Sequence, residues 1–528
     1  MKKLSLKSAI TAKEKLTLYV VLFSFVLLSA CSSPGYQTTK QGDINRLTKS
    51  ASFAMPKVKV PSFPNRTFNV LDYGADPTGV ALASPAIQQA IDECHAAGGG
   101  TVVIPAGIYT TAPLTLKSNV RLYTEPNSLI VFDHNLDLYE IYDEWFEGIP
   151  TKRCTSPLNA RGAENIAITG HGTFNGNGDW WRPLKKGKMA SSLWKKHLQE
   201  KGGIVVNDIW YPDSASLLAQ SYCVDQNVPV ITDDSLWQVV KSFLRPVMLH
   251  FVDCKGILLE GVTFENSPAW NLHPMCCENI ILRDLNVRNP WYSQNGDGVD
   301  IESCKNVVIS HCTFDVGDDA ICMKSGKDKP GRDRGIPTEN VVVDDCVVYH
   351  GHGGFVCGSE MSGGIRNVQV SNNLYIGTDV GLRFKSTRGR GGVVENIYIR
   401  DVYMANIPNE GLLFDLFYGG KGAGEETEEE LAARMNAEAP EVSEETPAFR
   451  NIVIENVTGH NLKRAVYFNG LPEQKIENVT LRNITMSATE GALFRQTKGL
   501  VIDHVQITPE KGEAFSLAPT VENVTINK

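Results

Sequence analysis

Four short polar clusters carry the side chains of this sequence that could do chemistry. They are NGDGVD at 295–300, GDD at 317–319, GHGG at 351–354 and RFK at 383–385. Their reactive members are three carboxylates, an imidazole and two cations: Asp297, Asp318, Asp319, His352, Arg383 and Lys385. If the fold brings these groups together, they can exchange protons with a bound molecule and hold a negative charge on it.

Carboxylates that lie close together share protons, and sharing moves their pKa values apart. Glycoside hydrolysis needs this division, because one carboxylic acid protonates the leaving oxygen while an ionised carboxylate activates water. Arg383 and Lys385 would hold an acidic sugar, Arg with a planar fork and Lys as a point charge. The set therefore predicts a hydrolase of an anionic carbohydrate. Asp300 could belong either to the site or to a turn network, and we interpret Asp344 and Asp345 as structural.

Each cluster taken alone is weak evidence, because two adjacent Asp are usually turn residues. The order of the four clusters along the chain, one after another, is what favours an active site. Metal binding by the carboxylates is an alternative, but the sequence contains nothing like a fixed calcium loop. We predict an enzyme without a metal or other cofactor.

A repeat must position these side chains. An Asn followed by alternating apolar residues recurs along the chain, at 165, 279, 306, 340, 367, 396, 451, 478 and 523. Short strands at a period of about 20–50 residues indicate a solenoid. We predict an all-β chain folded as a right-handed parallel β-helix; a propeller, whose blades are longer, is the alternative.

The repeat also sets the spacing of the reactive groups. Asp318 and His352 both lie 12 residues beyond the Asn of their repeats, at 306 and 340. Equivalent positions on adjacent coils are about 4.8 Å apart. Asp297 and Arg383 lie 18 and 16 residues beyond theirs, so their turns must differ, although they belong to the flanking coils.

A helix is expected before the repeats. SPAIQQAIDECHAAGGG places Ser84 as N-cap and Pro85 at the first helical position, with Gly98 as the stop. This helix would cap the open end of the solenoid, which otherwise exposes unpaired strand groups. Eleven cysteines follow Cys31, and several recur in strand register, so we expect free, interior thiols rather than several disulfides.

The N-terminus reads as a targeting signal. Basic residues precede the apolar run at 16–30, which is shorter than the roughly 20 residues that span a bilayer. LSAC at 28–31 resembles a bacterial lipobox, so we predict a signal peptide at 1–30, lipid attachment at Cys31 and a tether at 31–66; an ordinary signal peptide is the alternative. The protein would then be lipid-anchored in the cell envelope, at the outer membrane.

Composition limits the partners. The 528 residues are 42% hydrophobic and 21% charged, which suits a large ordered core, with a formal net charge of −9. That charge excludes a nucleic-acid binder held by a general basic face. A domain at 67–528 would carry insertions at about 180–244, which holds five Trp, and 420–448, which is rich in Glu. The Trp side chains fit a small subdomain core better than sugar stacking.

The sequence resembles the polygalacturonases of glycoside hydrolase family 28 from about residue 67 to the C-terminus. The resemblance covers FNVLDYGA, GGGTVVIPAGIYTTAPLTLKSNVRL, RPVMLHF, ENSPAWNLHP and the four polar clusters. Gly296 stands where the family usually has Thr, and RFK stands for its RIK. Both differences spare the reacting groups.

The resemblance implies a fold, an activity and roles. Members of this family are β-helical enzymes that invert configuration, use no metal and cleave α-1,4-galacturonosyl linkages of pectin, and the resemblance implies the same for this chain. The resemblance implies that Asp318 is the general acid and that Asp297 and Asp319 position and deprotonate the attacking water. It also implies that His352 adjusts the acidity of Asp318 through a hydrogen bond. Substrate contacts would come from Asn295, Arg383 and Lys385.

Other functions remain open from the sequence. A related rhamnogalacturonan or xylogalacturonan hydrolase is one, a β-helical pectate lyase using Ca²⁺ is another, and a non-catalytic carbohydrate-binding solenoid is the third. The insertion at 180–244 leaves the chain just before the coils of Asp297 and Asp318. It could close one end of the cleft, so we expect an enzyme that acts on chain ends. We also expect a monomer.

Overall fold

The computed structural model describes residues 35–527 except 226, 420–426, 428, 430, 431 and 434–437. Thr39–Lys528 form one compact unit, and of the other unit, Met1–Thr38, only residues 35–38 are described. The predicted signal peptide and Cys31 lie outside the described residues.

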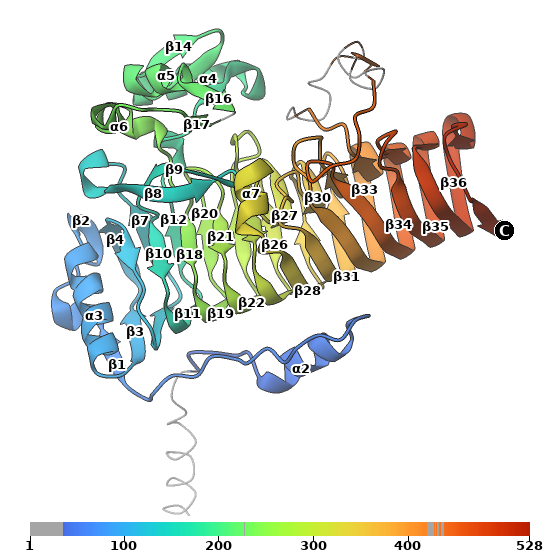
Figure 1. The fold of residues 1–528 in the computed structure, drawn as a ribbon. Coiled ribbons are helices and arrows are strands. Elements are labelled where there is room, and N and C mark those ends of the chain that lie inside the picture. The colour runs from blue at the N-terminus through green and yellow to red at the C-terminus, as the bar shows by residue number, and fades with distance from the viewer. Residues whose placement is uncertain are drawn as a thin grey trace, which may run out of the picture. The chain divides into compact units, whose positions relative to one another are not determined.

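Thirty parallel strands wind into a right-handed β-helix, as predicted (Figure 1). The first coils contain β1 Thr67–Asn69, β2 Thr78–Leu82, β3 Gly100–Ile104, β4 Gly107–Thr111, β5 Leu114–Thr115, β6 Val120–Thr124, β7 Ser128–Phe132, β10 Leu158–Arg161, β11 Glu164–Gly170 and β12 Thr173–Asn175. The central coils contain β18 Leu249–Val252, β19 Lys255–Glu260, β20 Thr263–Glu265, β21 Leu272–Met275, β22 Glu278–Arg283, β23 Asn286–Arg288, β24 Val299–Glu302, β25 Lys305–Ser310 and β26 Thr313–Asp315. The last coils contain β27 Asp319–Lys324, β28 Thr338–Asp344, β29 Val347–Val348, β30 Gly353–Cys357, β31 Ile365–Ile376, β32 Leu382–Lys385, β33 Val393–Asp415, β34 Ala448–Asn469, β35 Ile476–Arg495, β36 Thr497–Leu517 and β37 Thr525–Asn527.

The repeated Asn residues make a corner of each coil. Asn306, for example, adopts φ 61°, in the left-handed region that Asn tolerates better than most residues. Its amide donates to Asn279 Oδ1 at 3.4 Å, and Asn340 donates to Asn306 Oδ1 at 3.2 Å. The repeat therefore marks stacked turns rather than only strand starts. Between corners the apolar residues of all coils form one continuous buried core.

The predicted helix is α3, Ser84–Ala96, and it closes the first coil. Ile87, Ala90 and Ile91 are fully buried against that core. Ser84 is its first residue and Ala83 the N-cap, so the predicted cap is wrong by one position. The Ser84 side chain is buried in the cap interface, whereas an N-cap side chain must turn back to the helix N–H groups.

The cysteines after residue 35 are all free, and all but Cys223 and Cys276 are buried. Cys254, Cys277 and Cys304 stack on successive coils, with Cys277 Sγ 3.3 Å from Cys254 N. This confirms the predicted interior thiols for the part of the chain that the structure describes.

Part of the predicted tether is packed on the β-helix. α2, Gln41–Lys49, and the chain after it bury Ile44 and Val58 against an outer stripe that contains Leu258 and Ile281. Thr39 donates through its backbone and its hydroxyl to Glu260, each at 2.6 Å. This segment covers an apolar stripe on the outer face of the sheet, so residues 39–63 of the predicted tether are part of the folded unit.

Two insertions sit beside the coils that follow β12. The hairpin of β8, Ile141–Phe146, and β9, Ile149–Cys154, lies on the β-helix. The second contains β13 Leu184–Lys185, α4 Ser191–Lys201, β14 Ile204–Val206, β15 Ile209–Tyr211, α5 Ser214–Gln220, β16 Cys223–Asp225, β17 Val228–Pro229 and α6 Asp234–Val239. It forms the green lobe of Figure 1.

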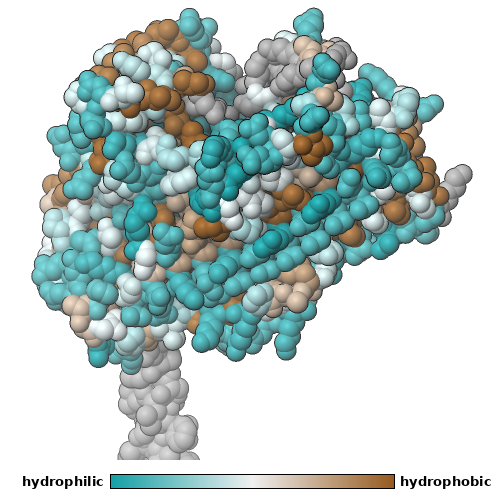
Figure 2. Space-filling model, viewed as in Figure 1, coloured by the Kyte–Doolittle hydropathy of each residue, from teal (hydrophilic) through white to brown (hydrophobic). Residues whose placement is uncertain are grey.

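The Trp residues of the second insertion form its interior. Trp181, Trp194, Trp210 and Trp237 are buried in two small apolar clusters, which confirms the core interpretation for most of them. Apolar side chains also gather on the surface of this lobe (Figure 2), among them Leu193 and Val230. The insertion is a folded subdomain rather than a solvated linker.

Part of the Glu-rich stretch lies outside the described residues, but its end is fixed. The Glu445 carbonyl accepts from Gly389 N and Gly391 N, each at 3.0 Å. Arg332 pairs with the Glu445 carboxylate at 3.3 Å. Among the helices that the structure describes, none is both long enough and apolar enough to cross a membrane.

Candidate active site

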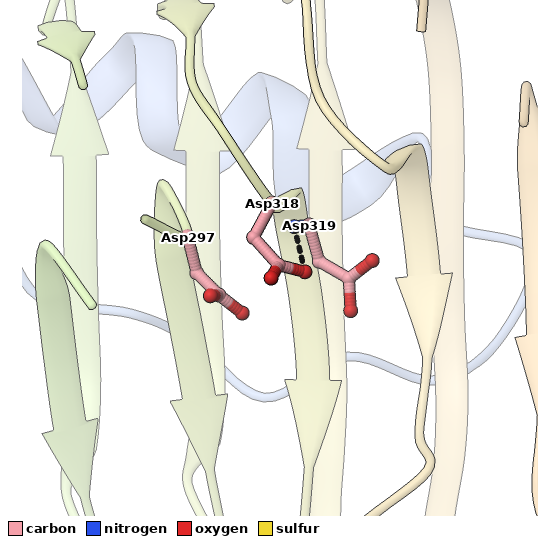
Figure 3. Close-up of side chains that lie close together, drawn as sticks. All are labelled: Asp297, Asp318 and Asp319. Carbon is pink, nitrogen blue, oxygen red and sulfur yellow. Dashed lines mark hydrogen bonds between the residues drawn. The ribbon is translucent and has the colours of Figure 1, made fainter. Parts of the chain in front are cut away.

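The four polar clusters meet on one sheet face. β24, β27, β30 and β32 pair side by side on successive coils, with Asp319 opposite Gly353 and Val356 opposite Arg383. Asp318 therefore lies beside His352, whose backbone N–H donates to the Asp318 carbonyl at 2.8 Å. Figure 3 shows Asp297 and Asp318 on neighbouring coils, with their carboxylates turned toward each other.

Asp318 and His352 form an ion pair. His352 Nδ1 is 3.2 Å from Asp318 Oδ1, and His352 Nε2 is 3.7 Å from Asp379 Oδ2. The Asp318 charge raises the pKa of His352 above its ordinary 6.5. Burial opposes ionisation of Asp318, but His352, Lys385 and Arg383 together hold its pKa below the usual range. In the free protein the proton of this pair therefore lies on His352, next to the Asp318 carboxylate.

Asp319 is bound by both predicted cations. Lys385 Nζ lies 2.7 Å from Asp319 Oδ2, and Arg383 Nη1 lies 3.2 Å from Asp319 Oδ1. All three side chains are almost completely buried. The two cations therefore pair with Asp319 as well as lining the site, which the sequence spacing did not reveal.

Asp297 lies in a different environment. It is buried, Asp300 and Asp318 are its anionic neighbours, and its Oδ1 has no protein hydrogen-bond partner. Burial first, and these two carboxylates second, raise its pKa well above the ordinary value. The pKa values of two neighbouring carboxylates are thus shifted in opposite directions, so that in the free protein Asp297 holds a proton more readily than Asp318.

The buried cation Lys324 pairs with two carboxylates next to the acidic cluster. Lys324 Nζ is 2.8 Å from Glu360 Oε2 and 3.5 Å from Asp300 Oδ1. Asp300 does not line the cavity, so it acts in this network and not as a direct substrate contact. Asp344 lies away from the cavity, where it accepts from Ser371 and Asn372.

A polar cavity of about 190 Å³ opens over these groups. All seven predicted catalytic and substrate-contacting residues line it, Asn295 included. Sequence reasoning missed further lining residues, which come mainly from other elements: Glu147, Lys185, Lys188, Trp270, Gln294, Lys324, Ser359, Glu360 and Tyr418. Only Lys324 had a signal, because it ends the strand that begins at Asp319.

Carboxylate oxygens of Asp297, Asp318 and Asp319 lie within 4.8 Å of one another. Such oxygens are the ligands that Mg²⁺ and Ca²⁺ prefer. However, His352, Arg383 and Lys385 already face this cluster, so a divalent ion would have to enter against three positive groups. The absence of a metal requirement stays a prediction.

Comparison with known proteins gives a consistent result. A family model described as "Glycosyl hydrolases family 28" matches residues 240–500, and one described as "Rhamnogalacturonase A/epimerase, pectate lyase-like" matches residues 67–137. The chain is 25% identical over 502 residues to an exo-poly-alpha-D-galacturonosidase of Dickeya chrysanthemi, covering 89% of this chain and 78% of that protein. It is 24% identical over 440 residues to a probable polygalacturonase of Vitis vinifera, covering 79% of this chain and 74% of that protein.

Solved structures extend the likeness to the whole fold. An exopolygalacturonase of Thermotoga maritima is 30% identical, covers 92% of this chain and 96% of its own, and superposes with a TM-score of 0.65. A family 28 exopolygalacturonase of Yersinia enterocolitica superposes with a TM-score of 0.68 at 22% identity, covering 88% of this chain and 79% of its own. With residues 240–500 matched by the family 28 model and 92% of the chain covered by the Thermotoga maritima structure, the chain belongs to glycosyl hydrolase family 28.

Proposed function

We propose that this glycoside hydrolase cleaves α-1,4-galacturonosyl linkages of polygalacturonan from the chain end. The observation that carries the proposal is the cavity, where three carboxylates lie beside buried cations and the pKa values of Asp297 and Asp318 are shifted in opposite directions. A neutral sugar would not need Arg383 and Lys385, whereas a galacturonate carboxylate does. Relatives named as polygalacturonases support the same substrate.

The proposed reaction is a single displacement. Asp318 delivers the proton that it shares with His352 to the leaving oxygen, because the pair holds one proton. Asp297 and Asp319 orient and deprotonate the attacking water. Asp319 is ion-paired with Lys385 and Arg383, whereas the raised pKa of Asp297 favours its protonated form in the free protein.

The stereochemistry is a separate test. Inverting enzymes usually separate their two carboxyl groups by about 6.5–9.5 Å to admit a water. Here oxygens of the three carboxylates lie within 4.8 Å, so inversion rests on the family resemblance. Proton NMR of the first products should show the β-anomer of galacturonate; initial α-anomer would reject a single displacement.

Attack from the chain end follows from the insertions. Lys185 and Lys188 of the second insertion and Glu147 of the hairpin line the cavity beside the catalytic coils. They would limit how far a polymer can extend beyond the catalytic groups. The names of the Thermotoga maritima and Dickeya chrysanthemi relatives support this mode.

One experiment tests substrate, reaction and mode together. The protein is incubated with polygalacturonate and a chelator, and products, reducing ends and viscosity are followed over time. Galacturonate should accumulate from the start while viscosity falls slowly. A rapid loss of viscosity at few cleavages would reject chain-end attack, an ultraviolet-absorbing product would indicate a lyase, and no release of reducing ends would reject hydrolysis.

The cellular location is proposed from the sequence. The lipobox at 28–31 supports lipid attachment at Cys31 and residence in the cell envelope. The net charge of −9 disfavours nucleic acid as a partner, and the proposed reaction uses no cofactor. We also propose that the protein is a monomer.

A further inference from the structure

Asn295 presents one side of its amide to the cavity and has the other side bound. Its Oδ1 accepts from Asn227 Nδ2 and from Arg245 Nη2, each at 3.1 Å. The reversed amide would bring an NH2 group against two donors, so the oxygen must face them. Since Asn295 lines the cavity, its NH2 group is the part left to face a ligand.

Asn227 is itself held from several directions. Its Nδ2 donates to Glu147 Oε1 at 2.6 Å, and its backbone N–H donates to Glu147 Oε2 at 3.3 Å. Its carbonyl accepts from Arg153 Nη2 at 2.8 Å, and its Oδ1 from Arg245 Nη2 at 3.4 Å. Glu147 and Arg153 belong to the β8–β9 hairpin, so both insertions meet at this one side chain.

Arg245 completes the arrangement from beneath. It is 2% exposed, and its guanidinium also donates to the carbonyls of Pro268 and Gln294, at 3.1 and 3.2 Å. All four acceptors are neutral oxygens, so burial lowers its pKa, to about 9. A buried cation facing neutral acceptors fixes their geometry and leaves its field available to a bound anion.

We propose that Asn227 and Arg245 are positioning residues, which lock the Asn295 amide as a hydrogen-bond donor to the acidic sugar. Through Asn227 the second insertion helps to position a substrate-binding side chain, in addition to forming part of the cavity wall. Because the ligand is taken to be a galacturonate unit, the inference rests on the proposed function. The donor would bind a carboxylate or hydroxyl oxygen of that unit.

A double-mutant cycle on binding tests this coupling. Calorimetry measures the Kd of trigalacturonate in the Asp318→Asn background, where hydrolysis is suppressed. Asn295→Ala and Asn227→Ala should each raise the Kd, roughly ten- to a hundred-fold for a hydrogen bond to a charged group. In the Asn295→Ala background, Asn227→Ala should then change the Kd less than about twofold, since it acts through the lost side chain.

Controls separate positioning from a general loss of structure. Gln238→Ala changes an exposed amide of α6 in the same insertion and should leave the Kd unchanged. If Asn227→Ala lowers the melting temperature, Asn227→Ser gives the same cycle with a smaller change. Arg245→Lys, which keeps the charge but not the fork, should weaken binding in the Asn295 background and not in the Asn295→Ala background.

Multiplicative effects of Asn227→Ala and Asn295→Ala would overturn the inference, as would an unchanged Kd in either single variant or no binding at all. If the double-mutant cycle shows coupling but the unaltered protein releases no galacturonate, only the proposed hydrolysis is rejected. Hydrolysis without coupling would reject only the positioning role.

Discussion

At the scale of single residues, the site depends on which carboxylate keeps a proton. Asp318 is paired with His352, Asp319 with two cations, and Asp297 with neither. Chemically identical side chains are thus separated by their partners. The predictions at this scale each remove one partner or one proton.

Asp318→Asn should abolish turnover and leave substrate binding largely intact, because it removes the proton donor with little change of shape. We expect a rise in the activation free energy of about 4 kcal/mol, in line with the value of general acid catalysis. Galacturonate release and trigalacturonate binding are measured together. Activity within tenfold of the unaltered protein would place the acid elsewhere.

Lys385→Met should raise the KM for polygalacturonate at least about tenfold, since it leaves a substrate carboxylate without a partner. It should also lower kcat, because Lys385 Nζ holds Asp319 at 2.7 Å. Kinetics on free and methyl-esterified oligomers give both effects. The unaltered protein should cleave the esterified form poorly, and equal cleavage would contradict the role of the two cations.

The pH profile should report the His352–Asp318 pair. Because the pKa of His352 is raised, the shared proton is present at low pH and lost as the pH rises through that pKa, so kcat/KM should fall above pH 6.5. Asp379 contributes to the shift from 3.7 Å. Asp379→Asn should therefore move the alkaline limb toward 6.5 with a similar plateau; an unchanged limb would mean that another group titrates.

At the scale of elements, the insertions do different work. The hairpin and the second insertion deliver side chains to the cavity, whereas the Glu-rich stretch meets the body mainly at Glu445. The acidic composition of this stretch cannot bury enough apolar surface to form part of the core. Its removal should therefore affect charge more than folding.

Deleting residues 421–440 should leave folding intact and change activity little at moderate salt. At low ionic strength the deletion should speed substrate binding, because the negative segment then repels the anionic polymer. At moderate salt this repulsion is screened. A deletion that extends through Glu445 removes its contacts with Gly389, Gly391 and Arg332 and should lower the melting temperature. Loss of folding on the shorter deletion would make the segment integral.

At the scale of the whole molecule, the β-helix sets the spacing between the polar clusters. Each coil adds one polar cluster to the same face, and ladders such as Asn279–Asn306–Asn340 keep the coils in register. The packed segment from Thr39 onward brings the N-terminal chain along the outside of this stack.

Cys31→Ala should convert a membrane-bound protein into a soluble one of unchanged specific activity. The proposed lipid attachment needs the thiol of this residue. Fractionation of cells with detection of the protein, together with labelling by a radioactive fatty acid, gives the answer. Label that persists in the variant, or a soluble unaltered protein, would contradict the lipobox interpretation.

The repeats and the four clusters let the sequence alone determine the β-helix, its capping helix, the free thiols and seven of the residues that line the cavity. These features are local or periodic, because one coil repeats the geometry of the next. Only the tertiary structure showed the pairing of Lys385 with Asp319 and the docking of residues 39–63. It alone also placed Glu147 and Lys188 at the cavity and Asn227 against Asn295. Those contacts join segments far apart in sequence and follow no period, so only the packing of the insertions on the coils decides them.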